Sequence, residues 1–201
     1  MARTLIVNGT VVSATGRSDM DVLIDGETIA ALYAPGQVAA QGVTADRTID
    51  ATGKYVIPGG IDAHTHLDMP FGGTFSVDDF RTGTIAAAHG GTTTVIDFAI
   101  QERGGTLRAA FDTWSKKAEG KAVIDYGFHM IMRESTPALR EEMGALVREG
   151  VTSFKLFMAY PGVFLMDDAS IFRTMQRSGE IGATICMHAE NGPVIDVLVE
   201  Q

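Results

Sequence analysis

The chain has 201 residues, of which 45% are hydrophobic and 20% are charged, a composition typical of a folded globular protein and not of a disordered one. Its net charge of -9 argues against a nucleic acid or an anionic membrane as partner. The single cysteine, Cys186, excludes an intrachain disulfide framework, and no apolar run approaches the roughly 20 residues that span a bilayer. Since the N-terminus also lacks a signal-peptide pattern, we expect a cytoplasmic protein.

Residues 1–55 are typical of a small all-β unit. Short β-branched runs flank Asn8-Gly9 and Asp25-Gly26, and both dipeptides are strong signals for a two-residue hairpin turn. Residues 47–59 add another short strand and a glycine turn. We therefore expect short antiparallel strands in this part of the chain.

From about Tyr55 onward the pattern changes to alternating strands and helices. Successive strands begin about 30 residues apart, which is the length of a βαβ unit. The pattern predicts a parallel sheet, either doubly wound or a TIM-type barrel, and divides the chain into domains 1–55 and 56–201. The first strand ends in histidines, whereas a Rossmann-type sheet has a glycine-rich loop there. The expected strands are residues 55–66, 92–99, 123–132, 153–160 and 183–190, and the expected helices lie within residues 76–91, 106–121, 136–150, 167–182 and 191–201.

Two features indicate where these helices begin. Ser76 is the expected N-cap of the first helix. Pro137 is expected in the first turn of the third helix, where proline is well tolerated.

Residues 59–70, GGIDAHTHLDMP, place two histidines at the end of the first barrel-type strand. Strand side chains alternate, so His64 and His66 are expected on one side, at the end where a barrel has its active-site mouth. The pair could bind one metal ion, or it could be two ordinary histidines in a polar loop. Asp62 precedes the histidine pair on the same side of the strand, and Asp68 follows the pair. Either carboxylate could lie near the metal ion or support one of its ligands.

Lys155 and His188 lie near the ends of two later strands. Lys155 is flanked by large apolar residues, and burial favours the neutral amine of a lysine, which can add carbon dioxide to become a metal-bridging carbamate. Its alternative role is a lysine whose head reaches solvent at a strand end. His188 could bind a second metal ion or be a structural histidine, and Tyr160 could stabilise a developing oxyanion or simply pack at the surface.

Other candidates have weaker support. We expect a structural or pocket-wall role for His129, a helix-end position for His89, and a buried, inert thiol for Cys186. Glu190 and Asn191 are expected to begin the loop and helix that follow His188, and not to bind metal.

Several motifs together are specific: GGIDAHTHLDMPFGGTFSVDDF, GGTTTVIDFA, DYGFHM, SFKLFMAY and MHAEN. With them the whole chain resembles the D-hydantoinase and dihydropyrimidinase branch of the amidohydrolase superfamily. The resemblance implies an α/β fold, a TIM-type (β/α)8 barrel preceded by a small β-sandwich built from both chain ends. About five of the eight βα units and half of the sandwich fall within these residues.

The resemblance also implies roles for individual residues. His64 and His66 would bind the more buried of two zinc ions, carbamylated Lys155 would bridge both, and His188 would bind the second. Tyr160 would be the catalytic residue that orients the amide carbonyl and stabilises its oxyanion. The substrate pocket would be shaped by Met69, Phe71, Phe157 and Phe164.

The implied activity is zinc-dependent hydrolysis of the cyclic amide bond of hydantoins or dihydropyrimidines to N-carbamoyl amino acids, through a metal-activated hydroxide. The implied partners are a small cyclic amide or ureide substrate and further copies of the chain, commonly in a tetramer. The alternatives are an allantoinase, a dihydroorotase, or a non-catalytic scaffold protein that lacks metal ligands. Dihydroorotases typically carry an arginine where this chain has Asp68, which disfavours an acidic substrate.

The family pattern includes a further histidine and an aspartate on later strands, beyond Gln201. We therefore expect the chain to be the N-terminal portion of a hydantoinase and to be inactive alone.

Overall fold

The structure is a computed structural model that describes residues 2–201 and divides into two compact units, Met1–Pro58 and Gly59–Gln201. The division falls between Pro58 and Gly59 because Tyr55 and Val56 still pair with the N-terminal sheet. Within the described residues, no helix combines the length and the apolar character needed to cross a bilayer.

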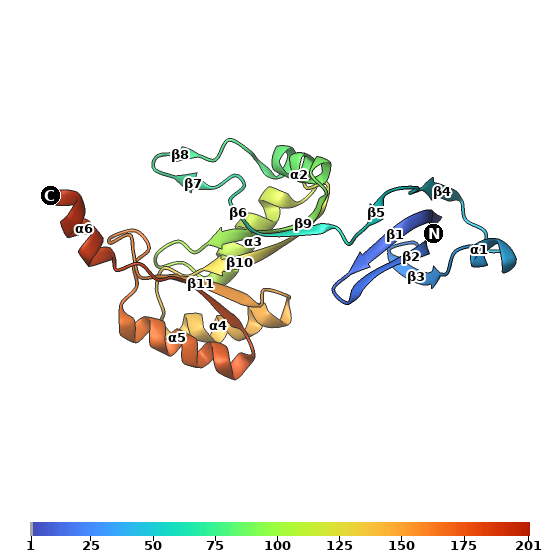
Figure 1. Cartoon of the computed structure of the whole chain (residues 1–201). Helices are drawn as coiled ribbons and strands as arrows, with labels where there is room; N and C mark the ends of the chain where they lie inside the picture. The colour runs from blue at the N-terminus through green and yellow to red at the C-terminus, as the bar shows by residue number, and fades with distance from the viewer. Residues whose placement is uncertain (1) are drawn as a thin grey trace. The chain divides into compact units, whose positions relative to one another are not determined.

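The N-terminal unit is a mixed five-stranded sheet (Figure 1). Its strand order is β3-β2-β1-β4, and β5 also pairs with β1. Because β4 and β5 run parallel to β1, the expectation of antiparallel strands alone is wrong. The described residues of this unit form this one sheet, so the expected sandwich is not shown. The elements are β1 Arg3–Ser13, β2 Gly16–Asp25, β3 Thr28–Tyr33, α1 Gln37–Ala40, β4 Arg47–Asp50 and β5 Tyr55–Val56.

One of the two predicted hairpins in this unit is wrong. Asn8 has a left-handed φ of 63°, but β1 continues through it, and the pairing with β2 shifts register between Ile6 and Gly9. The backbone N–H of Asn8 donates to the buried carboxylate of Asp21, 2.9 Å away. Asn8 is therefore part of a β-bulge and not of a turn. The hairpin at Gly26, with φ 61°, is confirmed.

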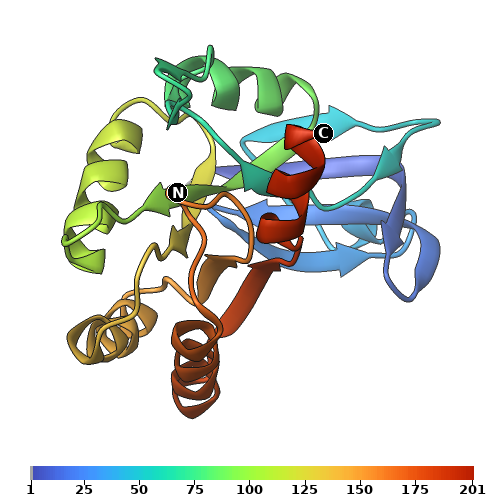
Figure 2. The same ribbon diagram turned by 90° about the vertical axis from the view of Figure 1, so that its left-hand side faces the viewer.

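The C-terminal unit contains a curled sheet of five parallel strands in the order β12-β11-β10-β9-β6. Each strand pairs with the next along the chain, and α2 to α5 follow one another around the outside of the curve (Figures 1 and 2). This arrangement is that of a partial barrel, as expected, and not of a doubly wound sheet. The strands are β6 Gly60–Thr65, β9 Thr92–Ile100, β10 Asp125–Ile131, β11 Ser153–Phe157 and β12 Thr184–His188, and the helices are α2 Phe80–His89, α3 Leu107–Ala118, α4 Pro137–Arg148, α5 Asp168–Ile181 and α6 Gly192–Glu200.

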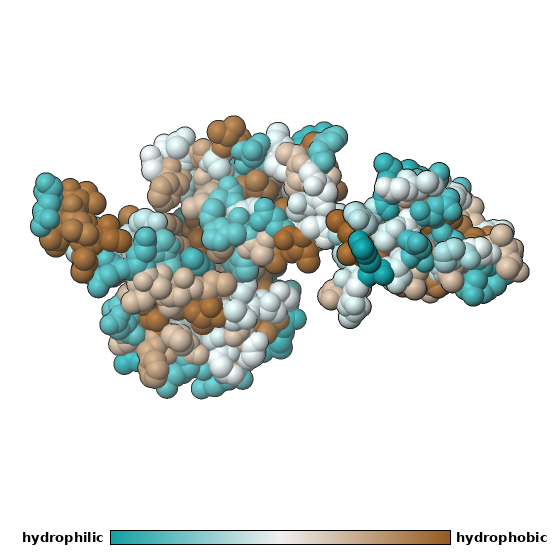
Figure 3. All heavy atoms as spheres, viewed as in Figure 1, coloured by the Kyte–Doolittle hydropathy of each residue, from teal (hydrophilic) through white to brown (hydrophobic). Residues whose placement is uncertain are grey.

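The core lies between these helices and the convex face of the sheet. In α3, the buried residues recur every three or four positions, which is the spacing of one helical face. They pack against buried side chains of the strands, including Met130 and Phe154, which are fully buried. The buried residues of α3 are Leu107, Ala110, Trp114 and Ala118. By contrast, α6 leaves much of its apolar surface exposed (Figure 3).

The N-cap of α2 is Asp79, and not Ser76 as predicted. The Asp79 carboxylate accepts from the backbone N–H groups of Arg81 and Thr82, and Thr82 completes a capping box. The Ser76 hydroxyl instead accepts from the N–H of Met69, 2.8 Å away. Pro137 lies in the first turn of α4, as predicted.

Candidate active site

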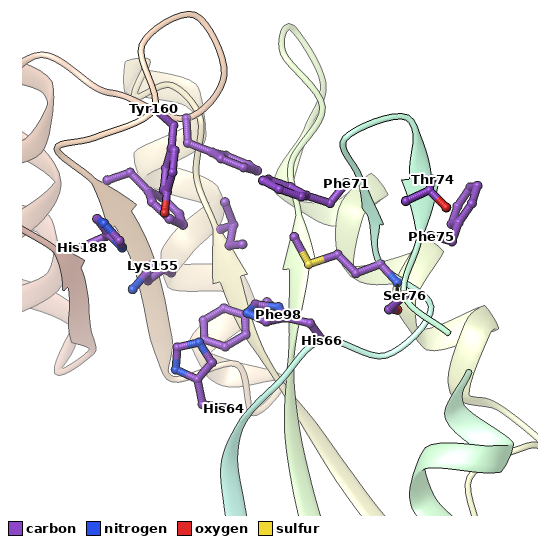
Figure 4. A pocket seen from close by; sticks show the side chains of 14 residues that line it. His64, His66, Phe71, Thr74, Phe75, Ser76, Phe98, Lys155, Tyr160 and His188 are labelled. Atoms are coloured by element: carbon purple, nitrogen blue, oxygen red, sulfur yellow. Dashed lines mark hydrogen bonds between the residues drawn. The ribbon is translucent and has the colours of Figure 1, made fainter. Parts of the chain in front are cut away.

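A pocket of about 530 Å³ opens where the parallel strands reach their carboxyl ends (Figure 4). Parallel barrels carry their functional residues at this end of the sheet. The wall of the pocket combines histidine, lysine and tyrosine side chains with a larger number of apolar ones. The lining residues are His64, His66, Met69, Phe71, Thr74, Phe75, Ser76, Phe98, Ile131, Lys155, Phe157, Tyr160, Phe164 and His188.

The two histidines of the HTH motif lie side by side on this wall. Their ring centroids are 5.1 Å apart, and both rings pack against Phe98, at 4.6 Å and 4.8 Å. The pairing of β6 with β9 is irregular between Asp62 and Thr65. A bulge next to an active site often changes the direction of a side chain. Here the irregular stretch includes His64, the first histidine of the motif.

His129 supports the irregular part of β6 from inside the barrel. Its Nε2 lies 2.9 Å from the backbone carbonyl oxygen of Ala63, and its Nδ1 is hydrogen-bonded to the hydroxyl of Ser153 on β11. When Nε2 donates to the carbonyl, Nδ1 accepts from the serine. Both ring nitrogens of His129 are therefore used structurally.

The surroundings of His66 favour its neutral form. Partial desolvation on the pocket wall lowers the pKa of His66 below its ordinary value of 6.5, although the residue as a whole is exposed. The positive charges of His64 and Lys155 act in the same direction, and the carboxylate of Asp97 opposes them. A neutral imidazole is the form that binds metal ions.

Lys155 and His188 enter the pocket from the neighbouring strands β11 and β12. The Lys155 side chain is half-buried, its Nζ lies 5.1 Å from the Phe157 ring centroid, and in the view of Figure 4 this nitrogen lies between His188 and His64. Phe157 is the register partner of His188, and their rings stack with centroids 5.6 Å apart. The structure thus places His64, His66, Lys155 and His188 in one pocket lining: His64, Lys155 and His188 lie on three strands, and His66 lies just beyond the end of β6.

Glu190 is hydrogen-bonded to His188, with 2.6 Å between Oε2 and Nε2. The sequence analysis assigned Glu190 only to the loop, because nothing in the local pattern indicates that it turns back to the histidine. Asn191 caps α6 as expected, accepting from the N–H of Val194. Cys186 is the register partner of Lys155 and is only half-buried, less than the buried thiol expected from the sequence.

Tyr160 occupies an unusual backbone conformation at the rim. Its φ is 62°, in the left-handed region that costs a non-glycine residue free energy. The strain is offset because its carbonyl oxygen accepts from the N–H groups of Val163, Phe164 and Leu165. The tyrosine side chain consequently extends into the pocket, with its ring 5.1 Å from that of His188 (Figure 4).

The apolar part of the pocket wall has a buried side and an exposed side. Phe157 and Phe164 are buried and stacked, with centroids 4.8 Å apart. Opposite them, Phe71 is 58% exposed on the hairpin of β7 Pro70–Phe71 and β8 Thr74–Phe75. Gly72 and Gly73, with φ of 60° and 81°, form its two-residue turn. The sequence analysis missed this hairpin, although Gly-Gly is a known hairpin signal.

The two aspartates near the histidine pair do not line the pocket. The Asp62 carboxylate accepts from the backbone N–H of His64 at 3.1 Å. Asp68 faces Lys117 on α3, with 3.9 Å between the carboxylate and Nζ. Asp97, a buried carboxylate behind the pocket wall, was not predicted from the sequence.

The types of donor atom in the pocket suit a divalent transition metal ion. Within residues 2–201, no three histidine, cysteine or acidic side chains form a metal-binding group. However, His64 and His66 are paired in one pocket, the pKa of His66 favours the ligating form, and the Lys155 amine lies on the same wall. Imidazole nitrogen is a good ligand for zinc and similar ions.

Comparisons with known proteins agree with this arrangement. The model of the amidohydrolase family matches residues 55–196. The chain is 58% identical to a D-hydantoinase of Streptomyces coelicolor, covering 100% of this chain and 43% of the relative, and 52% identical to a D-hydantoinase of Geobacillus stearothermophilus, covering 98% and 41%. It superimposes on the crystal structure of a dihydropyrimidinase from Brevibacillus agri with a TM-score of 0.93 and 50% identity, covering 99% of this chain and 42% of that one. The chain thus spans about two fifths of the length of these relatives.

Proposed function

Because the chain belongs to the amidohydrolase family, in its hydantoinase and dihydropyrimidinase branch, we propose that the whole protein is a metal-dependent hydrolase of cyclic amides. The observation that supports this most strongly is the convergence of His64, His66, Lys155 and His188 on one pocket. Three of them lie on the strands β6, β11 and β12, His66 directly follows β6, and all four line the pocket at the carboxyl end of the sheet, which supports the proposal.

In this proposal, His64, His66, a carbamylated Lys155 and His188 hold two zinc ions. When bound, such ions supply Lewis acidity and lower the pKa of a water molecule, which makes it a nucleophile near neutral pH. A carbamate on Lys155 would place a bidentate anion between the histidine pair and His188. His188 would then exchange its contact with Glu190 for a metal ion.

Tyr160 is the residue that we assign to the reacting carbonyl. Its phenolic O–H can donate to the oxygen of the ring amide as that oxygen gains negative charge. The left-handed backbone at Tyr160 and the hydrogen bonds to its carbonyl keep the side chain in the pocket. Water adds to the carbonyl carbon, the ring C–N bond breaks, the nitrogen takes up a proton, and an N-carbamoyl amino acid is formed.

The pocket wall favours an uncharged ring that carries an apolar substituent. Among the described residues, the lining contains no arginine that could pair with a substrate carboxylate. Met69, Phe71, Phe157 and Phe164 instead provide apolar and aromatic surface. We propose hydantoins and dihydropyrimidines as substrates, and these four residues as the surface for the substituent.

We also propose that the protein is cytoplasmic and homo-oligomeric. The single, half-buried Cys186 suits a reducing compartment. The expected tetramer rests on the family resemblance, and sedimentation of the full-length protein tests it. We propose further that the N-terminal sheet is half of a β-sandwich, since its exposed apolar residues include Ile29 and Leu32.

Turnover tests the substrate class. Purified full-length protein loaded with Zn²⁺ should open hydantoin and dihydrouracil rings much faster than those of dihydroorotate or allantoin. Preference for dihydroorotate or allantoin would contradict the proposed substrate class. Loss of all turnover on removal of Zn²⁺, and its return on adding Zn²⁺ back, would support the metal requirement.

A further inference from the structure

Asp97 is a buried carboxylate on β9 that accepts four hydrogen bonds. Its side chain lies behind the pocket wall, and Asp97 as a whole is 0% exposed. One oxygen, Oδ2, accepts from the hydroxyl of Thr65 at 3.0 Å and from the backbone N–H of Leu67 at 2.7 Å. The other oxygen, Oδ1, accepts from the N–H of Phe98 at 2.7 Å and from the indole N–H of Trp114 at 3.2 Å.

The donors to Oδ2 come from the two residues on either side of His66. A single oxygen atom therefore holds the side chain of the residue before this histidine and the backbone of the residue after it. The other oxygen is fixed by the strand of Asp97 itself and by α3. The carboxylate thus connects the loop that carries His66 to the rigid sheet and to the outer helix layer.

The outer helix holds the same loop at a second point. The Lys117 ammonium donates to the backbone carbonyl oxygen of Asp68, 2.5 Å away, and lies over the Trp114 ring at 4.4 Å. Asp68 has φ 49°, so the loop turns through a conformation that needs support from its surroundings. Trp114 and Lys117 lie about one helical turn apart on α3. Trp114 donates to the Asp97 carboxylate and Lys117 donates to the loop at Asp68, so α3 contributes to both supports of the loop.

We propose that Asp97 is a positioning residue that holds His66 in the orientation required for metal binding. This inference rests on the proposed function, because it assumes that His66 binds a metal ion. Residues that support metal ligands through hydrogen bonds typically change metal affinity or activity by about 10-fold to 100-fold when they are mutated.

The chemistry of the four donors explains why the position is an aspartate. An ionised carboxylate has only acceptors, so both oxygens can receive two N–H or O–H groups. An asparagine offers one acceptor oxygen, and its NH₂ group would face donors on the other side. Asp97→Asn therefore keeps the size of the side chain but disturbs one of the two sets of contacts.

The test uses Co²⁺ as a spectroscopic probe in the full-length protein. The Co²⁺ affinity and visible spectrum are measured for wild type, Asp97→Asn and Thr65→Val, together with hydrogen exchange of the Leu67 amide in the metal-free protein. We expect Asp97→Asn to bind Co²⁺ about 10-fold to 100-fold more weakly, with an altered spectrum and faster exchange at Leu67. Thr65→Val, which removes one donor to Oδ2, should change all three in the same direction but less.

Thr174→Val is the matched control. Thr174 is a threonine whose hydroxyl is hydrogen-bonded, as that of Thr65 is, but it is fully buried on α5, and its partners are Ser135 and Ser170. This variant should lose stability and keep the Co²⁺ affinity and spectrum of wild type.

Two outcomes overturn the inference. If a folded Asp97→Asn protein has the Co²⁺ affinity and spectrum of wild type, the positioning role is wrong. If Asp97→Asn does not fold, the test rests on Thr65→Val. A Thr65→Val protein with the Co²⁺ affinity and spectrum of wild type would then contradict the positioning role of Asp97. Wild type that binds no Co²⁺ would instead contradict the proposed function, and the inference with it.

Discussion

The guanidinium of Arg133 donates through Nε to the backbone carbonyl oxygen of Val163, 3.0 Å away. Arg133 follows β10, whereas Val163 lies in the loop after β11 that also carries Tyr160 and Phe164. The same guanidinium lies 5.5 Å from the Phe164 ring centroid. One side chain therefore stabilises both the backbone of the loop and an aromatic residue of the pocket.

Arg133→Met should impair binding of hydantoins with a bulky substituent more than binding of unsubstituted hydantoin. The variant removes the charged hydrogen bond from Arg133 to the loop that carries Phe164. Such a bond contributes at most about 1.5–3 kcal/mol. We expect KM for a phenyl-substituted hydantoin to rise roughly threefold to tenfold. Steady-state kinetics on the two substrates measures the difference.

Arg103→Met is the control for this variant. Arg103 donates to the same carbonyl oxygen at 3.3 Å but is more exposed, and the cation–π contact with Phe164 is made by Arg133. Its effect on KM should be smaller. An equal change for both substrates in Arg133→Met would show that the arginine does not act through the pocket wall.

Lys155→Ala should abolish turnover and weaken metal binding. If carbamylated Lys155 bridges the metal ions, its loss should reduce metal affinity and activity by more than the roughly 100-fold effect of losing a residue that only supports a metal ligand. Added short carboxylic acids should restore part of the activity, since they can occupy the place of the carbamate. Lys116→Ala, on the exposed face of α3, should behave like wild type. Full activity in Lys155→Ala would remove the bridging role.

His66 should titrate below 6.5 in the metal-free protein, because desolvation and the nearby positive charges of His64 and Lys155 lower its pKa. The unfolded chain then binds a proton at His66 more readily than the folded one does. Its contribution to stability is therefore unchanged above pH 6.5 and becomes unfavourable as pH falls through the lowered pKa. NMR titration of the histidine ring protons measures this, and a pKa at or above 6.5 for His66 would contradict it.

Two glycine substitutions should have opposite effects on stability. A Cβ on Gly192 would lie 2.9 Å from the Cα of Ala159 and 3.0 Å from the carbonyl oxygen of Met158, which is backbone that cannot easily move. A Cβ on Gly179, inside α5, would meet no atom within 4 Å. Gly192→Ala should thus cost about 1–3 kcal/mol, and Gly179→Ala should stabilise by about 0.5–1 kcal/mol. Urea unfolding of the full-length variants compares them, and equal effects would mean that the close approach at Gly192 has no energetic consequence.

The parallel strands and their helices could be predicted from the sequence because their signals are local. The buried face of α3 repeats every three or four residues, and Pro137 marks the start of α4. The Asn8-Gly9 prediction failed because Asn8 satisfies its backbone N–H with Asp21, a residue on the next strand. A two-residue pattern does not distinguish a bulge of this kind from a turn.

Several residues that line the pocket, including His64, Lys155 and His188, could be selected from the sequence, because strand ends in a barrel meet at one mouth. The contacts that orient them were not predicted, because they join positions far apart in sequence. Asp97 receives two of its hydrogen bonds from Thr65 and Leu67, about 30 residues earlier, and no local pattern distinguishes it from other strand aspartates. The left-handed backbone of Tyr160 is likewise set by the loop that folds back on it.

The central claim is that His64, His66, Lys155 and His188 form one metal centre bridged by a modified lysine. Native mass spectrometry of the full-length protein, combined with metal analysis, tests it most directly. We predict about two zinc ions per chain and one carbon dioxide adduct, located at Lys155 and absent from Lys155→Ala. A folded full-length protein with neither zinc nor an adduct would contradict the claim and favour a non-catalytic relative of the hydantoinases.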